Sequence, residues 1–158
     1  MIISCANDEN VEVPYSSLKG VSLEGLNLHR AELENMDLSK SSFRNSNLRG
    51  AFLYRSILNQ CNLSFTNLIV ADLRETELIE SNLKGCQAIS TLFEGANLTR
   101  ANLEEADISG ANFINSKLQG ANMKCSNIDT AKFQNAIFDD STVWPEMFDV
   151  IKNGCIRA

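Results

Sequence analysis

An apolar residue recurs at every fifth position of this chain from Leu18 to Phe138, without one insertion or deletion. If this position is called i, 16 of its 25 members are Leu, five are Phe and two are Ile, and Met123 and Ala88 complete the series. Position i−2 is Ala, Ser, Thr or Cys in 22 of the 25 repeats, and position i−1 is Asn or Asp in 13. Self-similarity at a fixed period predicts a repeat architecture.

The period of five predicts a very short strand followed by a corner in each repeat. Residues i−2 and i alternate with i−1 as in a β-strand, so one small and one large side chain point inward. Residues i+1 and i+2 break the alternation, and glycine, which tolerates unusual dihedrals, fills i+2 at Gly20, Gly25, Gly50, Gly85, Gly95, Gly110 and Gly120. Asn and Asp at i−1 can hydrogen-bond to the nearby backbone and hold such a turn. Stacked repeats of this kind form a solenoid.

The spacing of the phenylalanines indicates how many repeats make one coil. Phe93, Phe113 and Phe133 are 20 residues apart, so their rings stack if four repeats close a coil. The predicted core column is Leu33, Leu53, Leu73, Phe93, Phe113 and Phe133.

Residues 11–143 resemble the pentapeptide-repeat family, whose consensus is A(D/N)LXX. The triplets that carry the resemblance include Ala31-Glu32-Leu33, Ala71-Asp72-Leu73 and Ala96-Asn97-Leu98. The resemblance implies an all-β fold, a right-handed quadrilateral β-helix with 20-residue coils. At four repeats per coil and ~4.8 Å between strands, the chain would make about six coils and a rod roughly 30 Å long.

The pattern also divides the chain. Residues 1–10 are expected to be a cap strand or disordered, residues 11–143 the β-helix, and residues 144–158 a C-terminal cap. In this cap Pro145 fits a first helical position and Asn153-Gly154 a helix end, which predicts a short helix. Met147, Phe148, Val150 and Ile151 would then lie across the last coil and protect its open edge. The stretch Trp144–Asp149 resembles the tail of cyanobacterial pentapeptide-repeat proteins, with Met147 where those have Gly.

Ala88 is the one truncated residue in the i series. Two interpretations stay open. The first is a local bulge in which Ile89 or Leu92 fills the gap, and the second is a dent used for recognition. An uncompensated Leu-to-Ala hole in a core costs ~2–5 kcal/mol, which favours the rearrangement.

The sequence offers little for catalysis. Its one histidine, His29, falls at an exposed corner, and no nucleotide-binding, nucleophile-elbow or C-x-x-C motif is present. We therefore expect no enzyme, no catalytic residue, no cofactor and no metal. The net charge of −6 argues against broad binding to nucleic acid or an anionic membrane. Five cysteines without a pairing pattern favour a reducing compartment, the cytoplasm.

Outward positions carry the remaining information. From Leu38 to Ala71 there are four cations and no acid, namely Lys40, Arg44, Arg49 and Arg55, which would form a basic belt around one coil. A 20-residue coil would gather an apolar patch of Phe52, Ile69, Val70, Ile89 and Leu92, rimmed by Arg49, Arg55 and Asp72. A contiguous patch indicates an interface, whereas scattered apolar residues need no explanation.

The sequence thus favours a non-enzymatic protein–protein interaction module, with a regulatory role as one reading, that presents rigid side faces to an unidentified protein partner. We expect a monomer or an end-to-end dimer. The rival is a DNA-mimicking binder of gyrase or topoisomerase, like the quinolone-resistance members of the family. Against it stand the short chain and the basic belt that interrupts the acidic residues.

Overall fold

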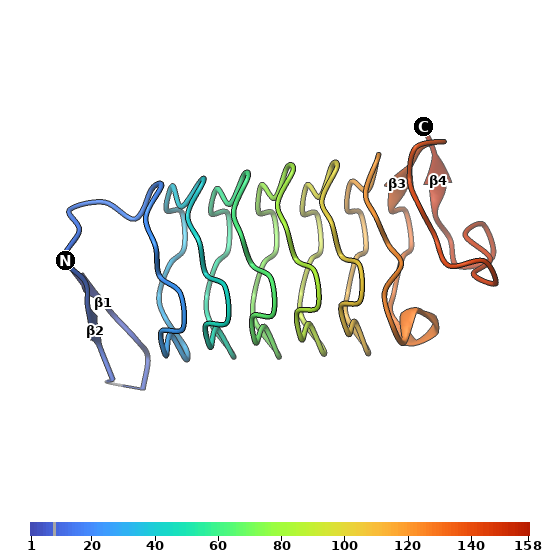
Figure 1. Cartoon of the computed structure of the whole chain (residues 1–158). Coiled ribbons are helices and arrows are strands. Elements are labelled where there is room, and N and C mark those ends of the chain that lie inside the picture. Colours follow the sequence, from blue (N-terminus) through green and yellow to red (C-terminus); the bar gives the residue numbers. More distant parts are fainter. Residues whose placement is uncertain (8) are drawn as a thin grey trace.

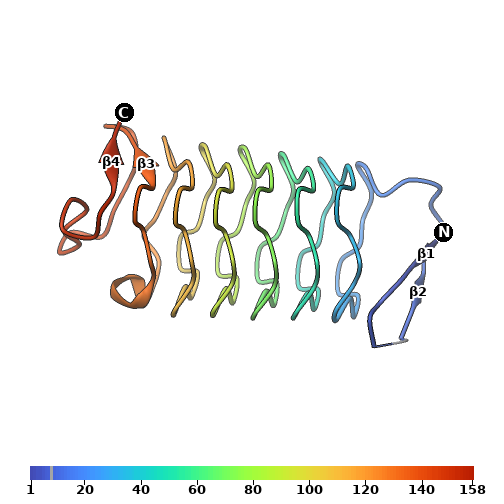
Figure 2. The same ribbon diagram turned by 180° about the vertical axis from the view of Figure 1, so that it is seen from behind.

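The computed structural model describes residues 1–7 and 9–158, and the coils follow one another in single file along one axis (Figure 1). Seen from behind, the same coils run in the same order from the N-terminal to the C-terminal end (Figure 2). Regular elements are few and lie at the ends: β1 (Ile2–Ile3), β2 (Val11–Glu12), the 3-10 helix η1 (Ile128–Thr130), β3 (Ile137–Phe138) and β4 (Ile156–Arg157). The described residues include no helix with the length and apolar character of a membrane span.

Between the ends, single parallel β-bridges hold neighbouring coils together. They join position i−1 of one repeat to i−1 of the repeat four places further along the chain, from Ser22↔Ser42 through Phe52↔Asp72 to Lys117↔Ile137. Each bridge is made by two backbone hydrogen bonds, as where Leu53 N–H donates to the carbonyl oxygen of Asp72 at 2.8 Å and Asp72 N–H to that of Ala51 at 2.9 Å. Four repeats therefore complete one coil, as the phenylalanine spacing predicted.

The corners are held by one backbone conformation. Every i+2 residue from Gly20 to Gly120 has φ between 53° and 69°, whether it is glycine or not. A positive φ at this position is the geometry of a type II turn, which explains the glycines. The Asn or Asp at i−1 accepts a hydrogen bond from the backbone N–H of i+1, for example Asn62 Oδ1 from Ser64 N at 3.1 Å. This confirms the predicted turn-holding role of Asn and Asp.

The N-terminal end differs from the predicted start of the β-helix near Val11. β2 does not join a coil but pairs antiparallel with β1, and Cys5 bridges Ala31 antiparallel. The regular ladder starts only at Gly20, whose N–H donates to the carbonyl oxygen of Ser39. An antiparallel cover uses the hydrogen-bonding groups of the first coil, which would otherwise be an open sheet edge. Asp8, inside the predicted cap, lies outside the described residues.

The C-terminal cap contains no helix within the described residues, so the predicted short helix is wrong. The segment after Pro145 makes successive turns and returns as β4, which pairs parallel with β3. Asp149 caps a single turn, in which its Oδ1 accepts the backbone N–H of Lys152 at 3.0 Å and its carbonyl oxygen accepts that of Asn153 at 3.1 Å. Gly154, with φ 82°, ends this turn before a helix can form. Phe148 is buried on the last coil, as predicted, whereas Met147 is 95% exposed and Ile151 66% exposed, so these two do not cover it.

The coil register slips at two places near the C-terminal end. Asp107 bridges Ser126 where the regular spacing would select Asn127, because Cys125 N–H donates to the carbonyl oxygen of Met123 at 2.7 Å in a tighter turn. η1 then restores the register, so that Lys132 bridges Asn112. Further on, Asn122 bridges Val143 where the regular spacing would select Thr142.

Ala88 lies in an ordinary coil. Its N–H donates to the carbonyl oxygen of Asp107 at 2.8 Å, and Gln87 keeps both of its bridges, to Asn67 and Asp107. Ala88 is fully buried. The structure therefore shows neither the predicted bulge nor a dent in the outer surface at this residue.

Candidate functional site

The interior of the rod is filled by its own side chains. All six residues of the predicted core column, from Leu33 to Phe133, are fully buried. The ring of Phe113 stacks on that of Phe93 at 4.7 Å and on that of Phe133 at 5.1 Å between centroids, in the arrangement that their spacing predicted. The surfaces available for binding are accordingly the outer faces, the edges between them and the two ends.

One face gathers three residues of the predicted patch. We call it the Phe52 face; it consists of the i−1 residues Glu32, Phe52, Asp72, Leu92, Asn112 and Lys132, joined in a row by β-bridges. Phe52 and Leu92 are half-buried and lie one coil to either side of Asp72. The sequence prediction that Phe52, Asp72 and Leu92 share a surface is consistent with this arrangement.

The adjoining corners form what we call the Val70 edge, made of residues 29–30, 49–50, 69–70, 89–90, 109–110 and 129–130. Gly50 N–H donates to the carbonyl oxygen of Ile69 at 2.9 Å, and Val70 N–H to that of Ile89 at 3.0 Å. Ile69 and Ile89 are half-buried, and Val70 is 51% exposed. The structure thus brings all five apolar residues of the predicted patch to one face and its bordering edge.

The apolar residues of this surface stand where the repeat favours other residues. Phe52 and Leu92 occupy i−1, where an Asn or Asp side chain would hold the following turn, as Asp72 does between them. Val70 occupies i+2 with φ 53°, a left-handed conformation that is unfavourable for a β-branched residue. Departures from local preference of this kind are expected at functional sites.

The opposite border of the Phe52 face carries a charge network that we call the Tyr54 cluster: Tyr54, Arg55, Asp72, Arg74 and Glu75. Arg74 binds Asp72 at 2.6 Å and Arg55 binds Glu75 at 2.7 Å. The guanidinium carbons of Arg55 and Arg74 lie 4.8 and 5.7 Å from the ring centroid of Tyr54, within cation–π range. Hydrogen bonds from Arg74 hold the pKa of Asp72 below its usual value, and those from Arg55 lower the pKa of Glu75.

The sequence predicted Arg55 and Asp72 at the rim of the patch. In the structure both are ion-paired within the molecule, Arg55 with Glu75 and Asp72 with Arg74. Sequence reasoning missed Tyr54, Arg74 and Glu75, although a coil of four repeats would have placed all three beside Arg55 and Asp72. Arg49, the third predicted rim residue, is exposed on the Val70 edge. The four cations of the predicted belt stand at four different corners of one coil and do not form one patch.

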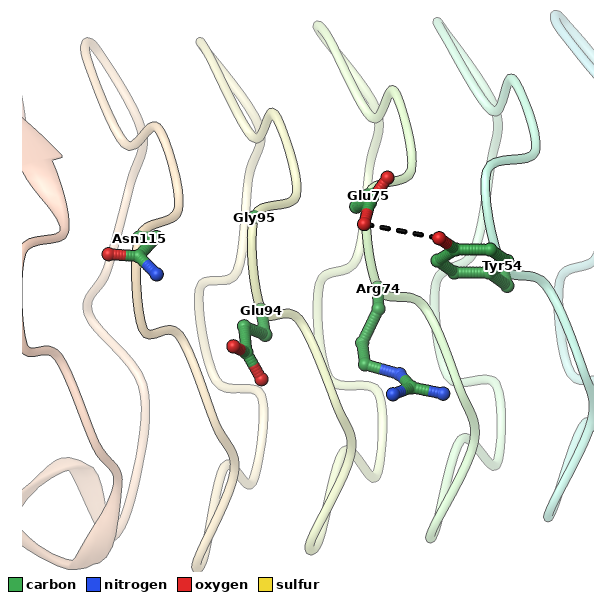
Figure 3. A pocket seen from close by; sticks show the side chains of 6 residues that line it. All are labelled: Tyr54, Arg74, Glu75, Glu94, Gly95 and Asn115. Atoms are coloured by element: carbon green, nitrogen blue, oxygen red, sulfur yellow. Dashed lines mark hydrogen bonds between the residues drawn. The ribbon is translucent and has the colours of Figure 1, made fainter.

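Two shallow surface depressions border the Phe52 face. The first, of about 440 Å³, is lined by Tyr54, Arg74, Glu75, Glu94, Gly95 and Asn115. Figure 3 shows it as an open strip along neighbouring coils, with the hydroxyl of Tyr54 bonded to Glu75. The second, of about 370 Å³, is lined by His29, Arg30, Arg49, Gly50, Phe52 and Val70.

The cysteines are ill placed for chemistry. Burial raises the pKa of Cys61 and of Cys86 to about 12 and that of Cys155 to about 11. Thiols with such pKa values are poor nucleophiles near neutral pH, because only the thiolate reacts. In the part of the chain that the structure describes, no group of three or more His, Cys, Asp and Glu side chains could hold a metal ion.

Comparison with known families matches the repeat directly. A model described as a pentapeptide repeat region covers residues 27–113, and one described as pentapeptide repeats in eight copies covers residues 96–135. The chain belongs to the pentapeptide repeat family. No curated protein sequence matches it.

Solved structures of this family align with the chain. The pentapeptide repeat protein alr5209 from Nostoc Pcc 7120 is 30% identical, with 70% of this chain and 86% of that chain covered and a TM-score of 0.43. HetL, a pentapeptide repeat protein from Nostoc sp. strain PCC 7120, is 23% identical over 87% of this chain and 81% of that chain, with a TM-score of 0.37. QnrB1, a plasmid-mediated fluoroquinolone resistance protein, is 19% identical over 89% and 84%, with a TM-score of 0.46.

Proposed function

We propose that this pentapeptide repeat protein is a non-enzymatic protein-binding module, built as a right-handed rod of about six coils. It binds its partner through the Phe52 face and the Val70 edge. The observation that carries this proposal is that Phe52 and Leu92 lie on one face of the rod and that Ile69, Val70 and Ile89 lie on the edge that borders it. Phe52 and Leu92 stand where other repeats have a turn-holding residue, and Val70 stands at a left-handed position, so these three apolar residues are kept against the local preference of the backbone.

The scaffold suits this role because its surface residues are fixed by the coil ladder. Each coil adds backbone hydrogen bonds on both sides, and the inward side chains are fully buried. A surface that is already ordered loses little conformational freedom on docking, which favours affinity. We include in this proposal a cytoplasmic location and a regulatory role. Both rest on the sequence alone.

The rival function, mimicry of duplex DNA toward gyrase, is less well supported by the charge arrangement. Many acidic side chains are paired with cations, including Glu75 with Arg55, Glu80 with Arg100, and Glu104 with Lys84. Paired carboxylates present a weaker negative potential than the continuous phosphate rows of a duplex. A supercoiling assay with purified gyrase separates the two functions, and inhibition at low micromolar protein would favour the rival.

The test of the proposal uses two matched double variants. Ile69→Asp with Ile89→Asp places two carboxylates in the apolar surface. Ile79→Asp with Ile114→Asp makes the same change at two other half-buried isoleucines, which also occupy position i+1. The N–H groups of Ile69 and Ile114 each donate to the asparagine side chain two residues earlier, and that of Ile79 donates to Asn59 on the preceding coil.

Tagged protein is used to capture partners from a lysate of the source organism, and the identified partner is then purified. Binding of the purified pair is measured by titration calorimetry. The Ile69/Ile89 variant should lose affinity by roughly 30-fold or more, as expected for buried interface anchors, while the control variant binds like the unmodified chain. Equal affinities of the two double variants would contradict the proposed surface. Thermal unfolding of both variants shows that the fold is retained.

A further inference from the structure

The Val70 edge changes in chemical character along the rod. The N-terminal coils carry the cations Arg30 and Arg49 on this edge, beside His29. The middle coils carry Ile69, Val70 and Ile89, and the C-terminal coils carry Ser109 and then the acidic Asp129. In a chain of net charge −6, a local group of cations is unexpected. The cationic end directly adjoins the apolar surface proposed above as the docking site.

The depression of about 370 Å³ at this junction is lined by both cationic and apolar residues. Its lining residues are His29, Arg30, Arg49, Gly50, Phe52 and Val70, and none of them is acidic. The aliphatic part of Arg30 lies over Gly50, where a Cβ would be 3.5 Å from Arg30 Cγ. This packing keeps Arg30 beside Arg49 on the next coil.

These two arginines differ from those of the Tyr54 cluster in their ion pairing. Arg55 and Arg74 are each bound to a carboxylate of the chain. Over residues 1–7 and 9–158, by contrast, no carboxylate oxygen lies within 4.0 Å of Arg30 or Arg49. Their charges are therefore available to an outside group, and a complementary partner would supply carboxylates there.

We propose that the Val70 edge binds a short acidic protein segment that carries apolar anchor residues. This inference rests on the proposed function and adds the chemistry of the partner. The carboxylates of the segment meet Arg30 and Arg49, and its apolar side chains contact Phe52, Val70 and Ile89. Nucleic acid is the less suitable occupant, because its affinity depends on many cation–phosphate contacts, and this chain is acidic overall.

The coil spacing sets the length of the segment. Arg30 and Ile89 lie three coils apart along the edge, which is about 14 Å at ~4.8 Å per coil. An extended strand rises ~3.3 Å per residue, so roughly four or five residues span the distance. A peptide of about ten residues therefore covers the site with residues to spare on either side.

The test uses fluorescein-labelled peptides of about ten residues and fluorescence anisotropy at low and at moderate salt. The first peptide combines glutamates with leucines. In the second, glutamines replace the glutamates; in the third, lysines replace them; in the fourth, serines replace the leucines. We expect the first peptide to bind at least about fivefold more tightly than each of the others, and salt to weaken it.

Two double variants locate the effect. Arg30→Gln with Arg49→Gln removes one cation at an i+2 and one at an i+1 position of the Val70 edge. Lys40→Gln with Arg44→Gln also removes one cation at an i+2 and one at an i+1 position, but at other corners of the rod. The first pair of substitutions should lower the affinity for the acidic peptide by about three- to tenfold. The second pair makes the same change in net charge and should change this affinity by less than about twofold.

The outcomes separate this inference from the proposed function. Equal binding of the acidic and neutral peptides, preference for the basic peptide, or tighter binding of a labelled oligonucleotide would overturn the acidic-segment inference. An equal loss in both cation variants would do the same. If the acidic peptide binds but the Ile69/Ile89 variant binds it as well as the unmodified chain does, the proposed docking surface itself is wrong.

Discussion

The stacked phenylalanine column gives a quantitative test of what holds the rod together. Phe113 is fully buried and stacks on Phe93 and Phe133 with interplanar angles of 10° and 6°. Phe43 is also fully buried at an i position, but its neighbours in the column, Leu23 and Leu63, are aliphatic. Replacing either phenylalanine by Leu, the commonest residue at i, keeps the repeat and removes one ring.

The two substitutions should differ by the ring–ring contribution. A swap of one large apolar residue for another in a core costs less than ~1.5 kcal/mol. Phe113→Leu additionally loses two aromatic contacts, each worth ~0.5–1.5 kcal/mol. The free energy of unfolding should therefore fall by about 1–3 kcal/mol more for Phe113→Leu than for Phe43→Leu.

The assay is equilibrium unfolding in urea near neutral pH, read by circular dichroism and by fluorescence of Trp144. The comparison is valid if both variants keep the m-value of the unmodified chain, because a changed slope would indicate a changed extent of unfolding. A Phe113→Leu variant that is no less stable than Phe43→Leu would refute the claim that stacking contributes beyond burial.

Two further predictions concern the Tyr54 cluster and the C-terminal cap. Because Arg74 lowers the pKa of Asp72, the ion pair stabilises the fold above the ordinary aspartate value of 3.8, and this stabilisation is lost as pH falls through the lowered pKa. Arg74→Gln should therefore lower the free energy of unfolding near neutral pH. The difference in this free energy between the variant and the unmodified chain should become smaller at acidic pH. In the cap, Phe148 packs on Trp144 at 5.3 Å and on Phe133 at 5.4 Å, so Phe148→Ala should cost about 3 kcal/mol or more. Met147→Ser should change stability by less than about 0.5 kcal/mol, since Met147 is almost fully exposed.

Each of these has a direct readout. Urea unfolding of the Arg74→Gln variant at a series of pH values gives the stability difference, and NMR titration of Asp72 should show its pKa rising in that variant. A stability difference that is the same at acidic and neutral pH would contradict the assigned role of the pair. For the cap, equal losses in Phe148→Ala and Met147→Ser would mean that Phe148 does not anchor this segment.

The candidate surface was partly predictable from the sequence. A coil of four repeats places Phe52, Asp72 and Leu92 in one row, and Ile69 and Ile89 in another, from their sequence positions alone. The same arithmetic did not reveal that Asp72 and Arg55 are neutralised by Arg74 and Glu75. Ion pairing depends on how long side chains turn on the surface, and residue spacing does not determine that.

The sequence by itself determined the inside of this protein. Inward and outward positions alternate within each repeat, so the local pattern predicts which side chains are buried and where each corner lies. Only the tertiary structure decided how the ladder starts and ends, because both ends depend on contacts between distant segments. The antiparallel bridge of Cys5 to Ala31, the slip at Cys125 and the helix-free cap anchored by Phe148 are all of this kind. At these places a regular coil lies on one side only, and the chain adopts the conformation that covers the open edge on the other side.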